Sequence, residues 1–416
     1  NIEAAAAWID GPPFSPASPL ADGLNDLAQN DGVALLRELT ALAPVDIPVM
    51  QEVASVQQDI LLSTVSRHLR SDIDLHKEYV RVWAEVYGRK AKLSAQGKYY
   101  GFDDKHQGII IGIDKLFENG SSLGLGFQRD NADVNTLQRN MNFETNTAFV
   151  YGEYALGDMY ASGLLSYGSS NVDEKKQVMG TMYKDDYNAQ FYGARALLGY
   201  EGNWFNPEME VRYQYLAAKN YTDGIGQKVS KESMDILTLR SGLRKIWGSG
   251  LLRPEIYLGA GYDVLTDRND AIVSIDNGTS YRVYGQRLGR FSAEANLGLG
   301  IHFPNHLTIS INYLGELRKH YYNHTGMLGL KYAFGGNKTK EQSNQNQIEA
   351  PEKDCYDCEK TTSEEEHITA VDIAEQESTI KEEKVISQTS IPEVANFAFD
   401  SKKPRLNINK INALKE

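Results

Sequence analysis

Apolar and polar residues alternate with a period of two over most of the chain between Tyr79 and Phe334. In residues 79–89 the even positions from 80 to 86 are Val or Ala, whereas positions 81, 85 and 89 are charged. Residues 208–215 and 307–316 repeat this alternation. Because successive side chains of a β-strand point to opposite faces of the sheet, the pattern predicts strands with one apolar and one polar face.

The alternating segments run for roughly ten residues or more, longer than the five or six residues usual in soluble sheets. A tilted strand that crosses a bilayer needs about that length. We expect about twelve strands, an even number, as in outer-membrane barrels. The predicted strands are residues 79–93, 107–118, 121–130, 141–155, 159–171, 187–201, 205–219, 234–247, 251–266, 288–303, 306–320 and 324–334. The sequence therefore predicts an all-β fold, an antiparallel transmembrane β-barrel.

The connections between these strands alternate in length. We expect tight turns at residues 119–120, 156–158, 203–204, 248–250 and 304–305, and long polar loops at residues 97–105, 130–140, 172–186, 221–233 and 267–287. In barrels of this type the short turns face the periplasm and the long loops face outward. We therefore expect the first strand to begin, and the last strand to end, on the periplasmic side.

Residues 1–75 carry a helical period in place of the period of two. Leucines recur at helical spacing from residue 20 to residue 42, and apolar residues do so from Val49 to Leu69, with Pro44 and Pro48 between the two stretches. This spacing predicts two amphipathic helices. A small helical subdomain packed on another part of the protein is the alternative interpretation.

Composition removes several classes of function. The net charge is −13, and Lys and Arg are spread among carboxylates, which argues against a nucleic-acid partner. No apolar run approaches the roughly 18 to 20 residues that a spanning helix needs, so a helical membrane protein is excluded. Residue 1 is Asn and no signal peptide is visible, so we expect a fragment or a processed product.

Residues 335–390 are rich in Lys, Glu, Asn, Gln, Ser and Thr, which predicts a disordered acidic and polar linker. This linker holds the only two cysteines, Cys355 and Cys358. A redox pair or half of a metal site is one interpretation. The favoured interpretation is a local disulfide or two thiols without a function, because His367 is the only further metal ligand nearby in the sequence.

Sequence motifs for catalysis are missing. The chain has no G-x-S-x-G, H-E-x-x-H or G-x-x-x-x-G-K-[ST] motif. The glycines from Gly120 to Gly126 fit a closely packed barrel strand better than a nucleotide site, because no βα unit follows them. We therefore expect no catalytic residue, no cofactor and no metal.

Residues 79–334 resemble the autotransporter β-domain. The resemblance rests on the order and spacing of four segments, namely Val82-Trp83-Ala84-Glu85-Val86-Tyr87-Gly88, the hairpin from Gly112 to Gly126, the stretch from Arg253 to Gly259, and Leu328-Gly329-Leu330-Lys331-Tyr332-Ala333-Phe334. It implies an outer-membrane barrel of Gram-negative type V secretion that exports and anchors an N-terminal passenger. The domains would then be a helical linker or plug (1–75), the barrel (76–334), the disordered linker (335–390) and a final segment (391–416).

The resemblance also implies roles for individual residues. The helix from Val49 to Leu69 would lie in or near the pore, facing a mostly polar inner wall. The candidate lumen-facing residues are Arg81, Glu85, Glu210, Arg212 and Arg240. The ending with Gly329, Tyr332 and Phe334 resembles the signal that the barrel assembly machinery reads, with its aromatic side chains facing lipid. The chain continues beyond this ending, and that extension would lie in the periplasm.

Residues 394–407 resemble the beginning of an outer membrane protein A-like peptidoglycan-binding domain, which implies peptidoglycan as a further partner. Two other functions stay open at this point. A porin-like diffusion channel, or a structural outer-membrane protein tethered to the cell wall, would use the same strands without the helices. An outer-membrane enzyme would need a catalytic constellation that the sequence does not offer.

Overall fold

The computed structural model describes residues 19–42, 46–70, 78–95, 101–136, 139–231, 233–248, 250–266, 271–274, 280–283 and 288–335. Several predictions lie outside these residues: the polar linker with Cys355 and Cys358, and the segment that resembles a peptidoglycan-binding domain. The described residues comprise the helices near the N-terminus and the strands that end at Gly335.

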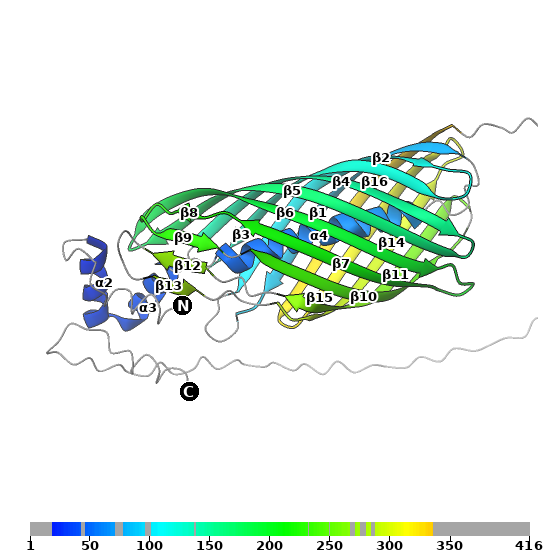
Figure 1. The fold of residues 1–416 in the computed structure, drawn as a ribbon. Helices are drawn as coiled ribbons and strands as arrows, with labels where there is room; N and C mark the ends of the chain where they lie inside the picture. Colours follow the sequence, from blue (N-terminus) through cyan, green and yellow to red (C-terminus); the bar gives the residue numbers. More distant parts are fainter. Residues whose placement is uncertain are drawn as a thin grey trace, which may run out of the picture. The chain divides into compact units, whose positions relative to one another are not determined.

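Twelve antiparallel strands form a closed barrel in the order β1-β16-β15-β14-β11-β10-β7-β6-β5-β4-β3-β2 (Figure 1). They are β1 (Tyr79–Leu93), β2 (Phe102–Leu116), β3 (Ser122–Asn135), β4 (Arg139–Leu156), β5 (Met159–Val178), β6 (Thr181–Tyr200), β7 (Asn206–Ala218), β10 (Met234–Ile246), β11 (Leu252–Thr266), β14 (Phe291–His302), β15 (Leu307–Arg318) and β16 (Tyr321–Gly335). Strands β1 and β16 close the sheet, with Tyr79 opposite Gly335 and Leu93 opposite Tyr321. The predicted barrel and its strand number are confirmed.

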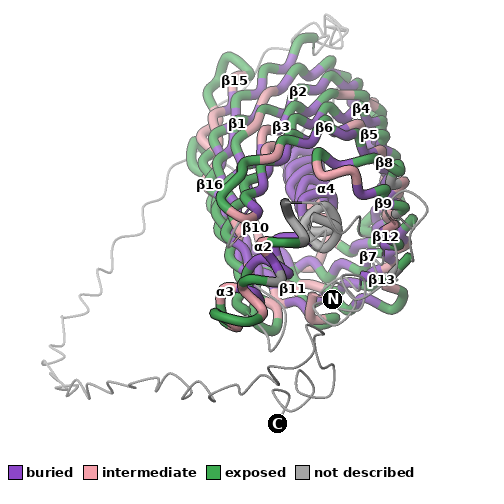
Figure 2. The backbone as a smooth tube through the Cα atoms, turned by 90° about the vertical axis from the view of Figure 1, so that its left-hand side faces the viewer, coloured by how far each residue is buried: buried purple, intermediate pink, exposed green. Residues whose placement is uncertain are grey.

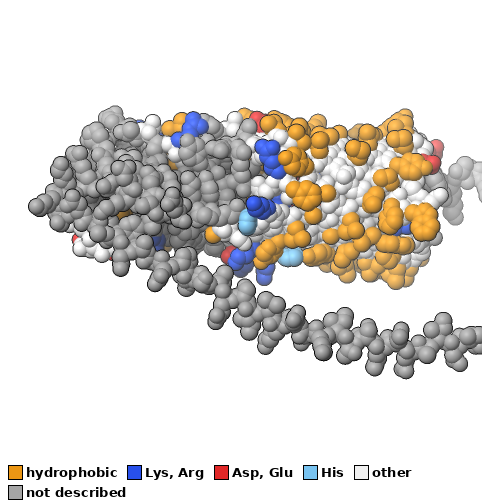
Figure 3. Space-filling view, turned by 90° about the horizontal axis from the view of Figure 1, so that it is seen from below, with side chains coloured by type: hydrophobic (Ala, Val, Ile, Leu, Met, Phe, Trp, Pro, Cys, Tyr) orange, Lys and Arg blue, Asp and Glu red, His pale blue; other side chains and the backbone are white. Residues whose placement is uncertain are grey.

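Each strand has a buried face and an exposed face, and the exposed face is apolar from the short turns to the middle of the barrel. On β1, Arg81 is 1% exposed, whereas its neighbour Val82 is 43% exposed. The same parity continues along β1, where burial alternates residue by residue. Figure 3 shows the exposed apolar side chains as a belt on the outer surface. A continuous belt of this kind is what lipid stabilises and water does not.

All five of the predicted long loops contain strand residues in the structure. Strands β5 and β6 each have 20 residues and run through the segment predicted as the loop 172–186. They turn at Met179 and Gly180, which have positive φ angles of 50° and 78°. Beyond the bilayer both faces of a strand can be polar, so the alternation disappears although backbone pairing continues. Strands β2, β3 and β4 extend into predicted loops in the same way, with Phe102, Asn135 and Arg139 as strand ends.

The loops predicted at 221–233 and 267–287 pair with each other. They contribute β8 (Tyr221–Thr222), β9 (Lys228–Lys231), β12 (Ala271–Ser274) and β13 (Tyr281–Val283) to a second, four-stranded sheet in the order β13-β12-β9-β8. Strand β9 pairs with β12 across about 40 residues of sequence, with Lys231 opposite Ala271. Short strands joined by contacts this distant leave no local pattern, which is why the sequence indicated loops.

Three helices precede the barrel among the described residues: α2 (Pro19–Asn30), α3 (Gly32–Leu42) and α4 (Asp46–Arg70). The sequence predicted two, because the first stretch is divided only at Asp31. The Asp31 carboxylate accepts hydrogen bonds from the backbone N–H groups of Val33 (3.1 Å) and Ala34 (3.0 Å) and thereby caps α3. Pro48 lies in the first turn of α4, where proline is tolerated, and does not interrupt the helix.

Helix α4 lies inside the ring of strands (Figure 2). Its 25 residues rise by about 1.5 Å each, which gives a length of roughly 38 Å, more than the roughly 30 Å of the hydrocarbon layer. None of the helices in the described parts of the chain is long and apolar enough to cross a lipid bilayer.

Candidate functional site

The candidate site is the barrel lumen, which α4 fills. Every residue of α4 from Val53 to Arg70 is buried or half-buried. Since a helix exposed to solvent on one side would show an exposed face, this burial means that the strands surround α4 on all sides. The side chains of α4 therefore contact the lumen wall around the whole helix.

One part of the wall is apolar and aromatic. The helix side chains Val56, Ile60, Leu61, Leu62, Val65 and Leu69 pack in one cluster with the wall residues Trp83, Tyr87, Ile110, Phe149, Tyr151, Leu164, Leu314 and Met327. The sequence predicted a mostly polar wall and missed these inward-facing rings. The helix is thus held by apolar packing as well as by polar groups.

The inward-facing aromatic rings have a signature in the sequence, because glycines lie opposite them on the neighbouring strands. Trp83 lies opposite Gly112, and Phe149 lies opposite Gly126. A Cβ atom at Gly112 would be 2.5 Å from the Trp83 ring, and one at Gly126 would clash with the Phe149 ring. Each glycine therefore makes room for a ring on the neighbouring strand, a pairing known to help define strand register.

Three of the predicted lumen residues surround the middle of α4. Asp59 Oδ1 is 2.5 Å from Nη1 of Arg212 and 3.9 Å from Nη1 of Arg240. Arg212 also pairs with Glu210, and Arg240 also pairs with Glu294. All of these side chains are buried or nearly so, which makes their interactions electrostatically strong and their mutual positions specific. The wall presents cations to the one carboxylate of this part of the helix.

The other two predicted residues meet the helix nearer its C-terminal end. Arg67 Nη2 donates to Glu85 Oε1 at 2.5 Å. Arg81 pairs with Asp114, and Asp114 Oδ2 lies 2.5 Å from His68 Nε2. Glu85 thus contacts α4 directly, whereas Arg81 acts on it through a carboxylate that the sequence did not single out.

His68 is held on two sides. Its ring stacks on Trp83 with centroids 4.8 Å apart. The Trp83 Nε1–H group donates to Tyr151 Oη at 2.7 Å, and the Tyr151 hydroxyl donates to Asp114 at 2.7 Å. Ring stacking and a shared carboxylate fix the rotation of the helix about its axis at this position.

Contacts in the middle and at the C-terminal end of α4 define its position along the pore. In the middle, Gln57 Nε2 donates to Asp130 (2.8 Å) and Thr145 (2.9 Å). At its C-terminal end, Arg70 pairs with Glu153 and lies 3.6 Å from the centre of the Tyr160 ring. Sequence reasoning missed these partners, since they depend on the depth to which the helix enters the barrel.

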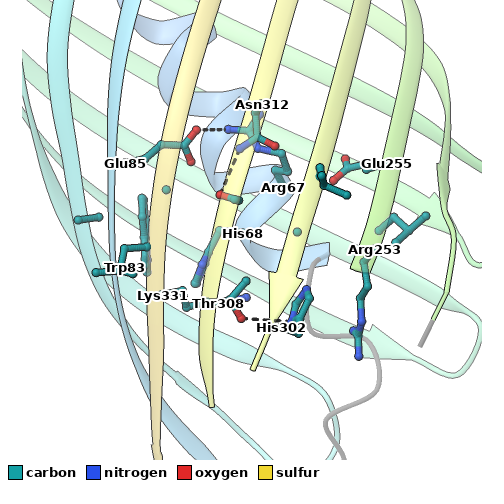
Figure 4. Close-up of a pocket in the computed structure, with 17 residues that line it drawn as sticks. Arg67, His68, Trp83, Glu85, Arg253, Glu255, His302, Thr308, Asn312 and Lys331 are labelled. Atoms are coloured by element: carbon teal, nitrogen blue, oxygen red, sulfur yellow. Dashed lines mark hydrogen bonds and ion pairs between the residues drawn. The ribbon is translucent and has the colours of Figure 1, made fainter. Parts of the chain in front are cut away.

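A small cavity remains between the end of α4 and the wall (Figure 4). Arg67, His68, Glu85, His302 and Thr308 are among its lining residues, and its volume is about 60 Å³. At roughly 10 to 15 Å³ for each water by this measure, it has room for about five water molecules. Within the described residues, no cluster of three or more His, Cys, Asp or Glu could hold a metal ion.

Helix α3 contacts the strands at the end of the barrel opposite the short turns. The Glu38 carboxylate accepts a hydrogen bond from the Met179 backbone N–H (2.6 Å), and Arg139 donates to the Ala41 carbonyl (2.7 Å). Leu24, Leu35, Leu39 and Leu42 pack with Val178, Val273 and Val283 of β5, β12 and β13. The two N-terminal helices are thus attached to the tip of the long β5–β6 hairpin and to the small sheet.

The predicted assembly residues lie on β16. Tyr332 and Phe334 face outward, 38% and 53% exposed, with ring centroids 4.6 Å apart. Gly329 faces inward, where a Cβ atom would clash with Ser310 Oγ and lie 3.5 Å from the Glu85 carboxylate. The two aromatic residues and the glycine therefore lie on opposite faces of the same strand.

Residues 82–314 match the sequence model of the family described as autotransporter beta-domain. Among solved structures, the chain is similar to the translocator domain of the autotransporter NalP from Neisseria meningitidis, with a TM-score of 0.60, 19% identity, and coverage of 70% of this chain and 100% of that one. The transport unit of the autotransporter AIDA-I from Escherichia coli gives a TM-score of 0.46 at 14% identity, with coverage of 64% and 92%. The beta domain of the Bordetella autotransporter Brka gives 0.43 at 15%, with coverage of 62% and 100%. No curated protein matches the sequence.

Proposed function

Because the chain belongs to the autotransporter β-domain family, we propose that α4 is the trailing end of an exported segment, held in the pore of its own translocator. The barrel is an outer-membrane translocator, and the family implies a passenger. The observation that carries the proposal is the burial of α4 from Val53 to Arg70 inside the strands. We propose no catalytic step for this part of the chain.

The direction of α4 supports export of the segment that precedes it. Its Arg70 pairs with Glu153, close to the short turn that joins β4 to β5. Its Gln57 meets Asp130 and Thr145, farther along β3 and β4 toward the long-hairpin end. Since short turns face the periplasm in such barrels, α4 leads from the periplasmic end, where β1 begins, to the outside. The residues before Asp46 would then be at the cell surface.

A protease-accessibility experiment tests this direction. A peptide tag placed before Asn1 should be digested when protease is added to intact cells, whereas the same tag in the short turn at Asn203 and Trp204 should be protected. Both tagged chains must migrate faster on gels when unboiled, which demonstrates a folded barrel. Protection of the first tag in intact cells, with digestion after the cells are permeabilised, would contradict the proposal.

A porin-like diffusion channel is the other candidate, and conductance separates the two. Because α4 fills the lumen, pores formed by the chain without residues 1–75 should have a higher single-channel conductance than pores formed by the full chain. The chain without residues 391–416 is the control, and its conductance should equal that of the full chain. Equal conductance with and without residues 1–75 would count against an occupied pore.

We also propose that Gly329, Tyr332 and Phe334 form the signal read by the barrel assembly machinery. The outward aromatic pair on the last strand supports this assignment. Phe334→Ala should slow the appearance of the folded form in cells and leave refolding in detergent unchanged. Phe303→Ala, an exposed aromatic residue outside β16, is the control. Equal slowing in cells and in detergent would indicate a plain loss of stability instead.

For the remainder of the chain, we propose the boundaries 1–75, 76–334, 335–390 and 391–416, with the extension after the barrel in the periplasm. The end of β16 at the short-turn side supports that location. Peptidoglycan is proposed as a partner of the final segment on sequence resemblance alone. Retention of a longer chain on purified peptidoglycan tests it, with the chain ending at residue 390 as the control, and no retention contradicts it.

A further inference from the structure

Three side chains that can carry positive charge lie in one row across three neighbouring strands. On β1, Lys90 is directly opposite His324 of β16 on one side and Lys105 of β2 on the other. All three residues are exposed, and they share the outward parity of the apolar belt. We call His324, Lys90 and Lys105 the basic row.

This arrangement costs stability unless an anion is present. Like charges directly opposite each other on paired strands repel and destabilise the sheet. Within the described part of the chain, Lys90 and Lys105 form no ion pair, whereas nearby outward cations do: Lys92 with Asp103 at 3.5 Å, and Arg129 with Glu144 at 3.6 Å. Asp133 of β3 lies opposite Lys105 on its other side, whereas Lys90 and His324 have no carboxylate directly opposite on either neighbouring strand.

The position of the row indicates where the anion would come from. From the basic row toward the short turns, the next outward-facing residues on β1 and β16 are Gly88 and Gly326. Val86 and Leu328 of the apolar belt follow them. The rings of Tyr313 and Tyr322 lie beside His324, with centroids 6.0 and 5.5 Å away. Tyrosines of this kind mark the interface between hydrocarbon and headgroups. Figure 3 shows Lys, Arg and His side chains gathered at one end of the apolar belt.

We propose that the basic row binds the phosphate groups of an anionic lipid headgroup in the outward-facing leaflet. Ammonium groups about one strand spacing apart, roughly 4.8 Å, can share the oxygens of one phosphate or of two neighbouring ones. The inference rests on the proposed function for the orientation of the barrel. It assigns the lipid to the β16–β1–β2 side, because three facing cations adjoin one another there. On β5 and β6 the facing Lys175 and Lys184 lie next to the facing Asp173 and Asp186, which would repel phosphate.

The test is binding of lipid A, which carries phosphate, to the full chain in neutral detergent, counted by native mass spectrometry. The Lys90→Gln/Lys105→Gln variant should bind about 25-fold more weakly, from roughly a fivefold loss for each lysine removed near an anionic headgroup. The control is Lys115→Gln/Lys245→Gln, which removes two exposed charges at the short-turn end. The affinity of this control variant for lipid A should match that of the unchanged protein. Phosphatidylcholine should bind the two variants equally.

Three results would overturn the inference. They are equal binding by the Lys90→Gln/Lys105→Gln variant and the unchanged protein, an equal loss in the control variant, and complete displacement of lipid A by an equal concentration of inorganic phosphate. Each variant is also assayed for the fast-migrating folded form and for surface exposure of the N-terminal tag. Lost lipid binding with both properties intact supports the inference. Intact binding with both properties intact refutes it and leaves the translocator proposal standing.

Discussion

The inner and outer faces of the same strands have opposite surroundings and opposite side chains. On β1, the inward Arg81 and Glu85 are buried and have partners of opposite charge, Asp114 and Arg67, whereas the outward Val82 and Val86 are exposed. In water a protein buries apolar groups and exposes charges. Here the pattern is reversed, because lipid surrounds the outside and a helix with its own charges occupies the inside. Mutations on the two faces should therefore destabilise the barrel for different reasons.

The largest effect is expected from Asp114, which Arg81, His68 and Tyr151 share. Asp114→Asn removes the negative charge opposite the buried Arg81 guanidinium, and breaking a buried ion pair from one side costs about 3 to 5 kcal/mol. The measurement is the free energy of unfolding from a urea series, followed by the fast-migrating form on gels. The exposed Asp103→Asn is the control, and its cost should stay below about 1 kcal/mol. Similar costs for the two variants would contradict the role of the inner network.

The stability cost of a charged substitution on the outer face should depend on the depth of that residue in the membrane. Ile111→Arg introduces a charge in the middle of the apolar belt, where such a change costs about 2 to 4 kcal/mol in a transmembrane barrel. Gln107→Arg lies on the same face of β2, past the belt, and should cost about 0 to 1 kcal/mol. Unfolding of both variants is measured in lipid vesicles. Equal costs would mean that the belt does not face hydrocarbon.

Glycine substitutions on one pair of strands compare the two faces directly. Gly112→Ala would bring a Cβ atom within 2.6 Å of three atoms of the Trp83 ring, and overpacking of this kind costs about 1 to 3 kcal/mol. Gly88→Ala meets nothing within 4 Å and should be neutral or slightly stabilising. Urea unfolding of both variants tests this, and a loss in Gly88→Ala as large as that in Gly112→Ala would refute it.

The smallest effect is expected outside the barrel. Asp31→Ala removes the cap of α3 and should cost that helix about 1 kcal/mol, while the barrel keeps its urea midpoint. Amide hydrogen exchange measures this as faster exchange confined to the first turns of α3. Asp26→Ala, which removes the acceptor of the Asn30 side-chain hydrogen bond within α2, should leave exchange in α3 unchanged. Faster exchange across the barrel strands would show that α3 and the barrel unfold together.

The sequence predicted those features that follow from local periodicity. Alternation in β1 identified the strands and their two faces, and the helical spacing up to Leu69 identified a helix, whose place in the pore was implied by the family resemblance. The partners of that helix were only partly predictable. Glu85 was anticipated from strand parity, but the contacts of His68 with Asp114 and of Gln57 with Asp130 depend on the depth and rotation of the helix in the lumen. No local pattern encodes those two quantities.

The same limit explains the strands that the sequence missed. Beyond the bilayer, β5 and β6 have polar residues on both faces, as at the outward Asp173 and the inward Glu174, so the apolar and polar alternation ends there while backbone pairing continues. The small sheet joins β9 to β12 from connections far apart in the chain. Alternation of apolar and polar residues marks a strand with lipid on one side. In β5 and β6 beyond the bilayer polar residues occupy both faces, although burial still alternates along β5.

The occupied lumen limits how often one barrel can be used. Helix α4 is covalently continuous with β1 and, at Arg67 and Arg70, is held by the wall beside the short turns. A second polypeptide could enter only after those contacts break and the helix leaves. Each barrel would then serve one cargo, its own, so that the number of delivered molecules equals the number of barrels made, and output is set by synthesis and not by turnover.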